Sequence, residues 1–354
     1  MGLVSRVVLG ACAVGLCLGG ATGRVLGNAA QPRIYVSNGG SGTIAEYDLQ
    51  SHALVESSVP ISPWGAGGNA VVLSDGSAII LPATYDIHKL RTARGEIALN
   101  TFSTYPPTIG PLATNGLDNF FAIDTKFRAV DEYVPHPKVR HKGVRYDGGG
   151  IGHGAGLPTH MAADSSDLWV TADNATVTHF SPSESVQSWT YPSGTVFADA
   201  YVDASSNAWV LFQSALPTYF ADDTSCSPEP SGPVTRYAIA AEYVGGQPAE
   251  VLYGQAGQNP VVAHIAVDEN ERVYVSASHV ILDFDPGTQC PDDALTIGLN
   301  EKNVLAPLAT YAADLYVADP VANAIDAYQG GTTTRLWRFT QPTGQSGPVS
   351  IHVQ

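Results

Sequence analysis

Short runs of alternating apolar and polar residues recur along most of the chain. In each clear copy an apolar run with a central aromatic residue is followed by a polar turn and a second alternating run that ends in another aromatic residue. Period-two alternation of this kind predicts pairs of half-buried β-strands joined as hairpins. The four clear copies begin at Ile34, Leu168, Val273 and Leu315.

Weaker copies occupy the gaps and bring the number of units to seven. The central residues of the first strands are Tyr35, Ile80, Phe121, Trp169, Trp209, Tyr274 and Tyr316, with spacings of 45, 41, 48, 40, 65 and 42. A period of about 40 to 50 residues with several short strands per unit is typical of a β-propeller. We therefore predict an all-β propeller of seven four-stranded blades, with six blades as the alternative because the second and third units are degenerate.

The two ends of the repeat array predict how the ring closes. The strand around Tyr35 has no innermost strand before it, whereas residues 348–353 form a strand-like run with no unit of their own. Pairing these two segments in one blade closes the ring and removes exposed sheet edges. We expect residues 31–354 to form this single domain.

Two stretches carry a resemblance to known propellers. They are Gly156-Leu157-Pro158-Thr159-His160-Met161-Ala162-Ala163-Asp164 with Leu168-Trp169-Val170-Thr171, and His264-Ile265-Ala266-Val267-Asp268 with Val273-Tyr274-Val275-Ser276. They resemble blades of NHL-repeat, gluconolactonase-like and virginiamycin B lyase-like propellers, a group that includes lactonases, lyases and non-enzymatic binding modules. The resemblance covers nearly all of 31–354 and implies an architecture with ligands bound in a funnel where the innermost strands meet.

Residues 1–30 are predicted to be a signal peptide with a short leader. Arg6 precedes an apolar run from Val7 to Leu18 that ends in small residues, as in export signals. A rival interpretation is a lipid anchor at Cys12. No other apolar run has the roughly 18 residues that a membrane span needs, so we expect a secreted protein, extracellular or periplasmic.

The net charge limits which partners the protein can bind, and the cysteine content limits which disulfides it can form. The formal charge of −16 argues against nucleic acid, because binding to phosphates needs a basic face. Cys226 and Cys290 are the cysteines outside the leader, and in an exported chain they form either one disulfide or two separate thiols.

The candidate site comes from the innermost strands of three consecutive units. His160, Asp199 and His264 fall at approximately matching positions near the starts of these strands. Two imidazoles and a carboxylate suit a divalent ion, Zn or Ca, and His153 on the preceding glycine-rich loop is the candidate catalytic base. The alternative is a polar lining without catalysis, since a slip of one residue turns these side chains away.

Two further segments stand out. A basic stretch around Lys142 either collects an anionic substrate or protects an outer edge strand from pairing with other chains. An insertion at roughly residues 214–233 accounts for the long spacing of 65 and is expected to be a long loop.

Two functions fit these observations. The first is a metal-assisted lyase or hydrolase that acts on a small molecule or sugar acid at the funnel. The second is a non-catalytic module that binds a protein or glycan. In either case we expect a monomer with a small-molecule, carbohydrate or protein partner and no nucleic acid.

Overall fold

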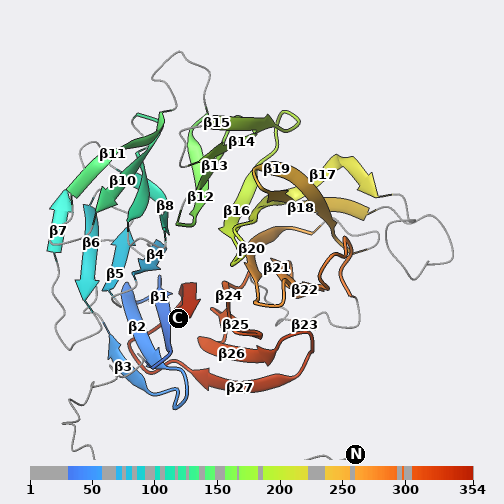
Figure 1. Ribbon diagram of the computed structural model, residues 1–354. Helices are drawn as coiled ribbons and strands as arrows, with labels where there is room; N and C mark the ends of the chain where they lie inside the picture. The colour runs from blue at the N-terminus through green and yellow to red at the C-terminus, as the bar shows by residue number, and fades with distance from the viewer. Residues whose placement is uncertain are drawn as a thin grey trace, which may run out of the picture. The chain divides into compact units, whose positions relative to one another are not determined.

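The computed structural model describes residues 31–57, 69–73, 77–81, 86–91, 100–103, 108–115, 119–124, 127–134, 140–147, 156–165, 167–181, 186–221, 236–255, 260–292, 297–298 and 305–353. Its regular elements are 28 β-strands, β1 to β28 (Figure 1). Pro32–Gln354 form one compact unit. The predicted all-β architecture is therefore confirmed in the described part of the chain.

The strands form seven four-stranded antiparallel sheets, called blades 1 to 7 in chain order. From the innermost strand outward, blade 1 contains β28 (Pro348–Val353), β1 (Arg33–Asn38), β2 (Thr43–Asp48) and β3 (Leu54–Ser57); blade 2 contains β4 (Asn69–Val72), β5 (Ser77–Leu81), β6 (Asp86–Arg91) and β7 (Asn100–Ser103); and blade 3 contains β8 (Thr108–Thr114), β9 (Phe120–Asp124), β10 (Ala129–Val134) and β11 (Arg140–Asp147).

The remaining blades repeat this order. Blade 4 contains β12 (Pro158–Ala163), β13 (Leu168–Ala172), β14 (Thr176–Phe180) and β15 (Val186–Thr190); blade 5 contains β16 (Phe197–Val202), β17 (Ala208–Ala221), β18 (Arg236–Val244) and β19 (Gln247–Tyr253); blade 6 contains β20 (Val262–Val267), β21 (Val273–Ala277), β22 (Val280–Phe284) and β23 (Ile297–Gly298); and blade 7 contains β24 (Leu308–Tyr311), β25 (Asp314–Asp319), β26 (Ala324–Gln329) and β27 (Arg335–Thr340).

The central residues of the repeat units mark one position in this architecture. Each of the seven residues predicted from Tyr35 to Tyr316 lies in the second strand of a different blade. The described ones are buried, with Trp169 2% and Tyr274 1% exposed. Propeller blades of four strands are thus confirmed, and the repeat follows from the need to place one large side chain between neighbouring sheets.

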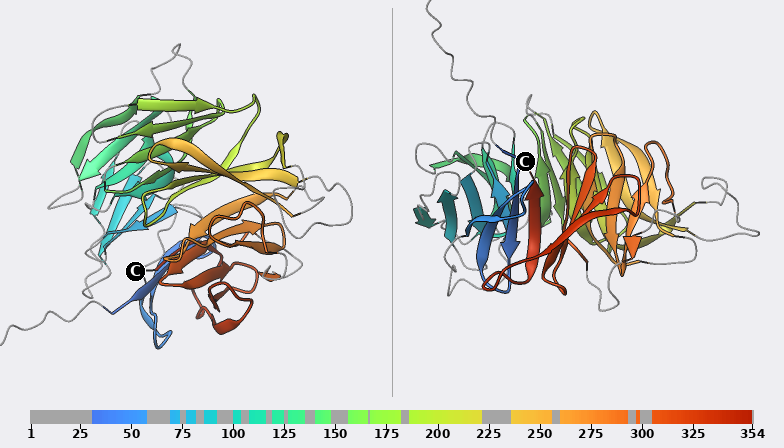
Figure 2. Two further views of the ribbon diagram at one scale, coloured as in Figure 1. Left: turned by 45° about the vertical axis from the view of Figure 1, so that its right-hand side comes forward. Right: turned by 90° about the horizontal axis from the view of Figure 1, so that it is seen from below.

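The innermost strands form a closed ring within this unit. Each contacts the innermost strands of the blades before and after it, and β28 contacts both β24 and β4. The ring arrangement is visible in Figure 1, and Figure 2 shows the blades from two other sides. In blade 1, β28 pairs antiparallel with β1, with Ile351 opposite Val36, as the analysis of the termini predicts.

Buried amides reinforce the closure in blade 1. Asn38 Nδ2 donates to Gln345 Oε1 at 3.1 Å, and Gln341 Nε2 donates to Asn38 Oδ1 at 2.8 Å. Tyr47 Oη donates to Gln341 Oε1 at 3.0 Å. Because these amides are buried, the reciprocal hydrogen bonds avoid the cost of an unpaired polar group.

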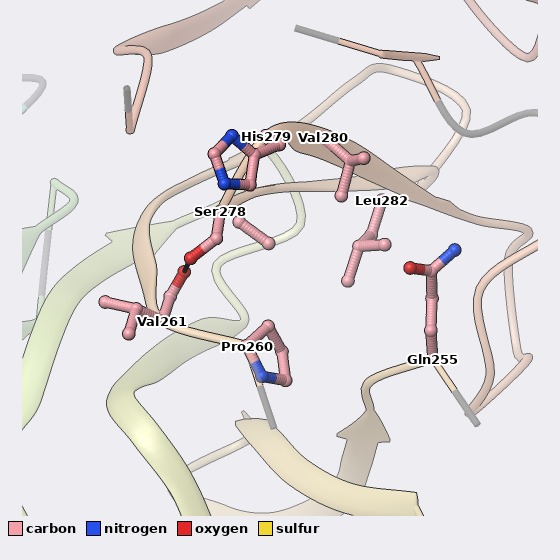
Figure 3. A pocket seen from close by; sticks show the side chains of 8 residues that line it. Gln255, Pro260, Val261, Ser278, His279, Val280 and Leu282 are labelled. Carbon is pink, nitrogen blue, oxygen red and sulfur yellow. Dashed lines mark hydrogen bonds between the residues drawn. The ribbon is translucent and has the colours of Figure 1, made fainter. Parts of the chain in front are cut away.

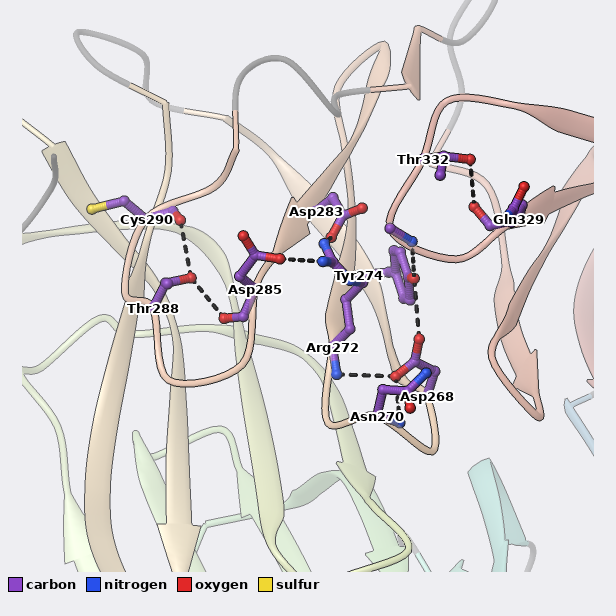
Figure 4. A network of polar contacts seen from close by, with 11 residues as sticks. Asp268, Asn270, Arg272, Tyr274, Asp283, Asp285, Thr288, Cys290, Gln329 and Thr332 are labelled. Atoms are coloured by element: carbon purple, nitrogen blue, oxygen red, sulfur yellow. Dashed lines mark hydrogen bonds and ion pairs between the residues drawn. The ribbon is translucent and has the colours of Figure 1, made fainter. Parts of the chain in front are cut away.

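An aspartate after the innermost strand links the turn to the central residue of the blade. In blade 6, Asp268 Oδ1 accepts from the backbone N–H groups of Asn270 and Arg272, and Tyr274 Oη donates to Asp268 Oδ2 at 3.2 Å (Figure 4). Asp203 plays the same part in blade 5, where it accepts from Trp209 Nε1 at 3.1 Å. These bonds explain why the apolar runs end near Asp in the sequence.

Apolar packing between blades forms the core. The cluster between blades 5 and 6 contains Trp209, Leu252, Ile265 and Val275, all nearly or fully buried. Equivalent clusters lie between the other described blade pairs from blade 3 to blade 1. Burial contributes about 25 cal/mol per Å² of apolar surface, so the faces of the blades hold the ring together.

The insertion differs in part from its prediction. Residues 214–221 are not loop, because they extend β17 to Ala221 and continue the pairing with β18 through two register shifts. Residues 222–235, including Cys226, lie outside the described residues. Cys290 is disulfide-bonded, which agrees with the disulfide alternative for this cysteine.

The basic stretch lies at an edge. The strand β11 is the outermost strand of blade 3, and Lys142 Nζ lies 2.7 Å from Glu132 Oε1 on the adjacent strand β10. This placement supports the edge-strand interpretation.

Among the residues that the structure describes, no helix is long and apolar enough to cross a bilayer.

Candidate functional site

His160, Asp199 and His264 occupy the same register in three consecutive blades. They lie on the innermost strands β12, β16 and β20, opposite Thr171, Leu211 and Ser276 respectively. Each partner follows the central residue of its blade by two positions. The alignment predicted from the sequence is therefore the alignment in the structure. We call these three residues the inner-ring cluster.

A β-bulge precedes each member of the cluster. The pairing of β12 with β13 shifts between Pro158 and His160, so that Thr159 is the extra residue. The same shift occurs at Ala198 before Asp199 and at Ala263 before His264. Bulges bend a strand and redirect the side chains beside them. The repeated bulge therefore sets the orientation of all three side chains.

Asp199 joins blades 5 and 6. Its Oδ1 accepts from its neighbour Ala200 N at 2.9 Å, and its Oδ2 accepts from Ile265 N on β20 at 3.4 Å. The same Oδ2 lies 3.7 Å from His264 Nδ1, and both side chains are partly exposed, at 28% and 34%. This carboxylate thus lies beside the Nδ1 side of the His264 ring and favours a proton there.

His160 is the more buried imidazole. Burial lowers the pKa of His160; the carboxylate of Asp199 raises it and His264 lowers it further. Its Nδ1 is buried and has no hydrogen-bond partner among the residues that the structure describes. A lowered pKa keeps the ring neutral at pH 7, and a neutral ring with an unpaired nitrogen is suited to accept or donate a proton.

The geometry of the inner-ring cluster supports metal binding less well than it supports proton transfer. In the described ranges, no group of three or more His, Cys, Asp or Glu side chains is arranged to hold a metal ion. His153, the candidate base and further ligand, lies outside the described residues. As placed, the inner-ring cluster alone does not make a ligand set, and the divalent ion stays a prediction.

Three hydroxyl groups near the cluster were not identified from the sequence. The buried Thr171 accepts from His160 N at 3.1 Å and so holds the bulged backbone. Tyr201 Oη and Thr310 Oγ1 both donate to the carbonyl of Val267, at 3.4 and 2.6 Å, and connect blades 5, 6 and 7. Tyr201 lies two residues after Asp199, and Thr171 lies two residues after Trp169; Thr310 has no such signal in the sequence.

A second, acidic cavity lies beyond the other ends of β16 and β20. It has a volume of about 190 Å³ and is lined by Trp209, Leu252 and Val273 and by five carboxylates, which are Asp203, Glu242, Glu250, Glu271 and Asp285. Burial raises the pKa of Glu242 to about 7, with a further contribution from three neighbouring carboxylates. Burial also raises the pKa of Glu250. This acidic cavity contains no imidazole.

Structural comparison places the fold among known propellers. The chain superposes on virginiamycin B lyase from Staphylococcus aureus with a TM-score of 0.56 and 8% identity, over 80% of this chain and 87% of that one. A putative 6-phosphogluconolactonase from Bacteroides fragilis gives a TM-score of 0.60 and 12% identity, over 92% and 99%. Apo AztD from Citrobacter koseri gives 0.62 and 10%, over 91% and 98%.

The chain therefore has a β-propeller fold that it shares with a lyase and a putative lactonase. The resemblance noted from the blade motifs is thereby confirmed at the level of architecture. No family model and no curated protein matches the sequence. Function therefore has to be argued from the residues of the site, because one propeller fold supports many activities.

Proposed function

We propose that the protein is a small-molecule lyase or hydrolase that works by acid–base chemistry at the inner-ring cluster. The observation that carries this proposal is the buried, neutral His160 with an unpaired Nδ1, coupled to the Asp199–His264 pair. A satisfied polar lining would not leave a buried imidazole nitrogen without a partner.

The two imidazoles suit complementary roles. The neutral His160 accepts a proton from a carbon beside a carbonyl or from a water molecule. The doubly protonated form of His264, with its Nδ1–H beside Asp199, gives its Nε2 proton to the departing oxygen. The proton taken up by His160 then returns to His264 through water, which completes the cycle. In elimination a C–H bond and a C–O bond break and a C=C bond forms; in hydrolysis water adds across the C–O bond.

The similar structures agree with this class of reaction. One is named a lyase and another a putative lactonase. At 8% and 12% identity they support the fold alone, so the reaction class in this chain rests on the cluster. Neither step requires a divalent ion. Elemental analysis of the purified protein tests the separate metal prediction.

Export is the second part of the proposal. The predicted signal in residues 1–30 and the disulfide at Cys290 both fit an oxidising compartment. N-terminal sequencing of protein recovered from the medium or periplasm tests it. An intact Met1 on protein found only in the cytoplasm contradicts it.

The reaction is tested with a panel of lactones and cyclic esters, followed by mass spectrometry. Ring opening by elimination leaves the mass unchanged, whereas hydrolysis adds one water. We expect His160→Ala and His264→Ala to lose turnover while keeping the circular dichroism of the folded protein. His352→Ala, a substitution of an exposed histidine on the innermost strand β28, is the matched control and should keep turnover. Turnover that persists in both cluster variants contradicts the proposal.

A further inference from the structure

A cavity separate from the inner-ring cluster lies in blade 6, between the segment that leads into β20 and the hairpin that joins β21 to β22. Its volume is about 200 Å³. Pro260, Val261, Val280 and Leu282 line it with aliphatic surface, and Gln255 and His279 add an amide and an imidazole. Figure 3 shows His279 and Gln255 on different sides of the cavity.

The wall of this cavity is held by a specific contact. Ser278 donates to the carbonyl of Val261 twice, from its backbone N at 2.9 Å and from Oγ at 3.2 Å. These bonds fasten the hairpin to the segment before β20. Hydrogen bonds therefore hold the two segments of the cavity wall together at this point.

His279 occupies a conformation that the turn alone does not favour. Its φ is +69°, in the left-handed region where glycine is normally found at this place in a two-residue turn. Within the described residues its ring has no hydrogen-bond or ion-pair partner. Ala175 has the same left-handed conformation in the turn between β13 and β14, so the unpartnered imidazole, and not the strain, is the feature that points to a ligand.

The volume and lining of this cavity indicate which class of ligand it can bind. A cavity of about 150 Å³ holds one benzene molecule, so about 200 Å³ holds one six-membered ring with a small substituent. The aliphatic lining suits the ring, and His279 and Gln255 suit a hydroxyl or carbonyl substituent. The formal charge of −16 disfavours an anion.

We propose that this cavity is the subsite for a neutral, ring-bearing group of the substrate. This inference rests on the proposed function, because it links the cavity to the inner-ring cluster. Val261 comes three residues before His264, which corresponds to about 10 Å along an extended strand. The cavity and His264 therefore lie at the same end of β20.

Binding is tested by calorimetry with phenol as the probe. Val280→Phe fills the cavity, and we expect phenol affinity to fall about tenfold or more. Val321→Phe is the matched control, because Val321 is an exposed valine between β25 and β26, outside the cavity. His279→Gly should raise the melting temperature by relieving the left-handed strain, yet weaken phenol binding. Unchanged affinity in both Val280→Phe and His279→Gly overturns the subsite.

A second measurement separates this inference from the proposed function. A phenyl-substituted lactone and its unsubstituted parent are compared in wild type and Val280→Phe. We expect the ratio of KM for the phenyl compound to KM for the parent to rise in Val280→Phe. Phenol binding without turnover of any lactone upholds the subsite and contradicts the proposed function. Turnover with the same KM ratio in both proteins upholds the function and overturns the subsite.

Discussion

The two ends of β16 and β20 carry opposite arrangements of charge. Near their starts, Asp199 lies between two imidazoles, whereas beyond their ends five carboxylates line the acidic cavity. In the first arrangement the carboxylate has partners that can carry positive charge. In the second, burial and three neighbouring carboxylates raise the pKa of Glu242. One end of β16 and β20 therefore carries the inner-ring cluster, which we propose for proton transfer. The other end carries the acidic cavity between blades 5 and 6, where the charge of Glu242 changes with pH.

The cation at the acidic end is Arg272, and its removal has the largest expected effect. Its guanidinium lies 2.6 Å from Asp283 Oδ1 and also pairs with Asp285 (Figure 4). Burial raises the pKa of Asp283 to about 6 even with this partner. Arg272→Met leaves a buried carboxylate uncompensated, and we expect a loss of about 3–5 kcal/mol in the free energy of unfolding, measured with urea.

Arg335→Met is the control for that experiment. Arg335 is half exposed and its contact with Asp326 is 3.4 Å. Exposed pairs contribute about 0–1 kcal/mol, so this variant should be almost as stable as wild type. Equal losses in the two variants contradict the special role of Arg272 at the acidic end.

Asp199→Asn tests the inner-ring cluster, and its expected effect is the second largest. The amide keeps the shape of Asp199 but not the charge beside His264 Nδ1. Misorientation of a catalytic group costs on the order of 100-fold in rate, so kcat/KM on whichever lactone is turned over should fall by about that factor. A rate within twofold of wild type removes Asp199 from the proposed mechanism.

Glu242→Gln removes a titratable group from the acidic cavity. The pKa of Glu242 is about 7 in the folded protein against 4.5 for a free glutamate, so the folded state is favoured by protonation. Stability from this group is present below pH 4.5 and is lost as pH rises toward 7. Because the group is partly solvated, we expect the Gln variant to be more stable at pH 8 by only about 1 kcal/mol.

The pH dependence of unfolding checks this prediction. The two stability curves should converge at pH 4, separate progressively between pH 4.5 and 7, and stay a constant distance apart above pH 7. Glu269→Gln, an exposed glutamate that does not line the cavity, should follow wild type throughout. A constant difference between Glu242→Gln and wild type at every pH contradicts the assigned titration.

The smallest expected effect is a change in the titration of His160. Asp199 raises the pKa of His160 and burial lowers it, so loss of the carboxylate removes the raising contribution. In Asp199→Asn the imidazole of His160 should titrate at a lower pH than in wild type, as followed by NMR of its ring protons. A higher pKa in the variant contradicts the coupling between the two residues.

Most of the blade pattern could be predicted from the sequence because one interaction repeats in every unit. A large side chain such as Tyr274 must lie between neighbouring sheets, and an aspartate such as Asp268 must complete the turn beside it. The register of His160, Asp199 and His264 follows from those anchors, since each lies opposite the residue two positions later.

Other features could not be predicted because they combine separate units. The acidic cavity gathers Glu242 from β18, Glu250 from β19 and Glu271 from a turn of blade 6. Glu242 and Glu250 lie opposite one another on paired strands of blade 5, but Glu271 comes from the next unit along the chain. The extension of β17 was missed for a different reason: Pro217 suggests a loop, yet β17 accommodates it within a stretch of shifted register.

The pairing of β28 with β1 also determines when the molecule can be completed during synthesis. Asn38 and Gln345, which bond to one another in blade 1, are 307 residues apart. A ribosome that releases the chain from its N-terminus exposes β1 long before its inner partner exists. Blade 1 therefore cannot be completed until β28 has been made, and contacts between residues so far apart in sequence form slowly. Any factor that binds the inner edge of β1 during synthesis has to leave before the final six-residue strand can pair.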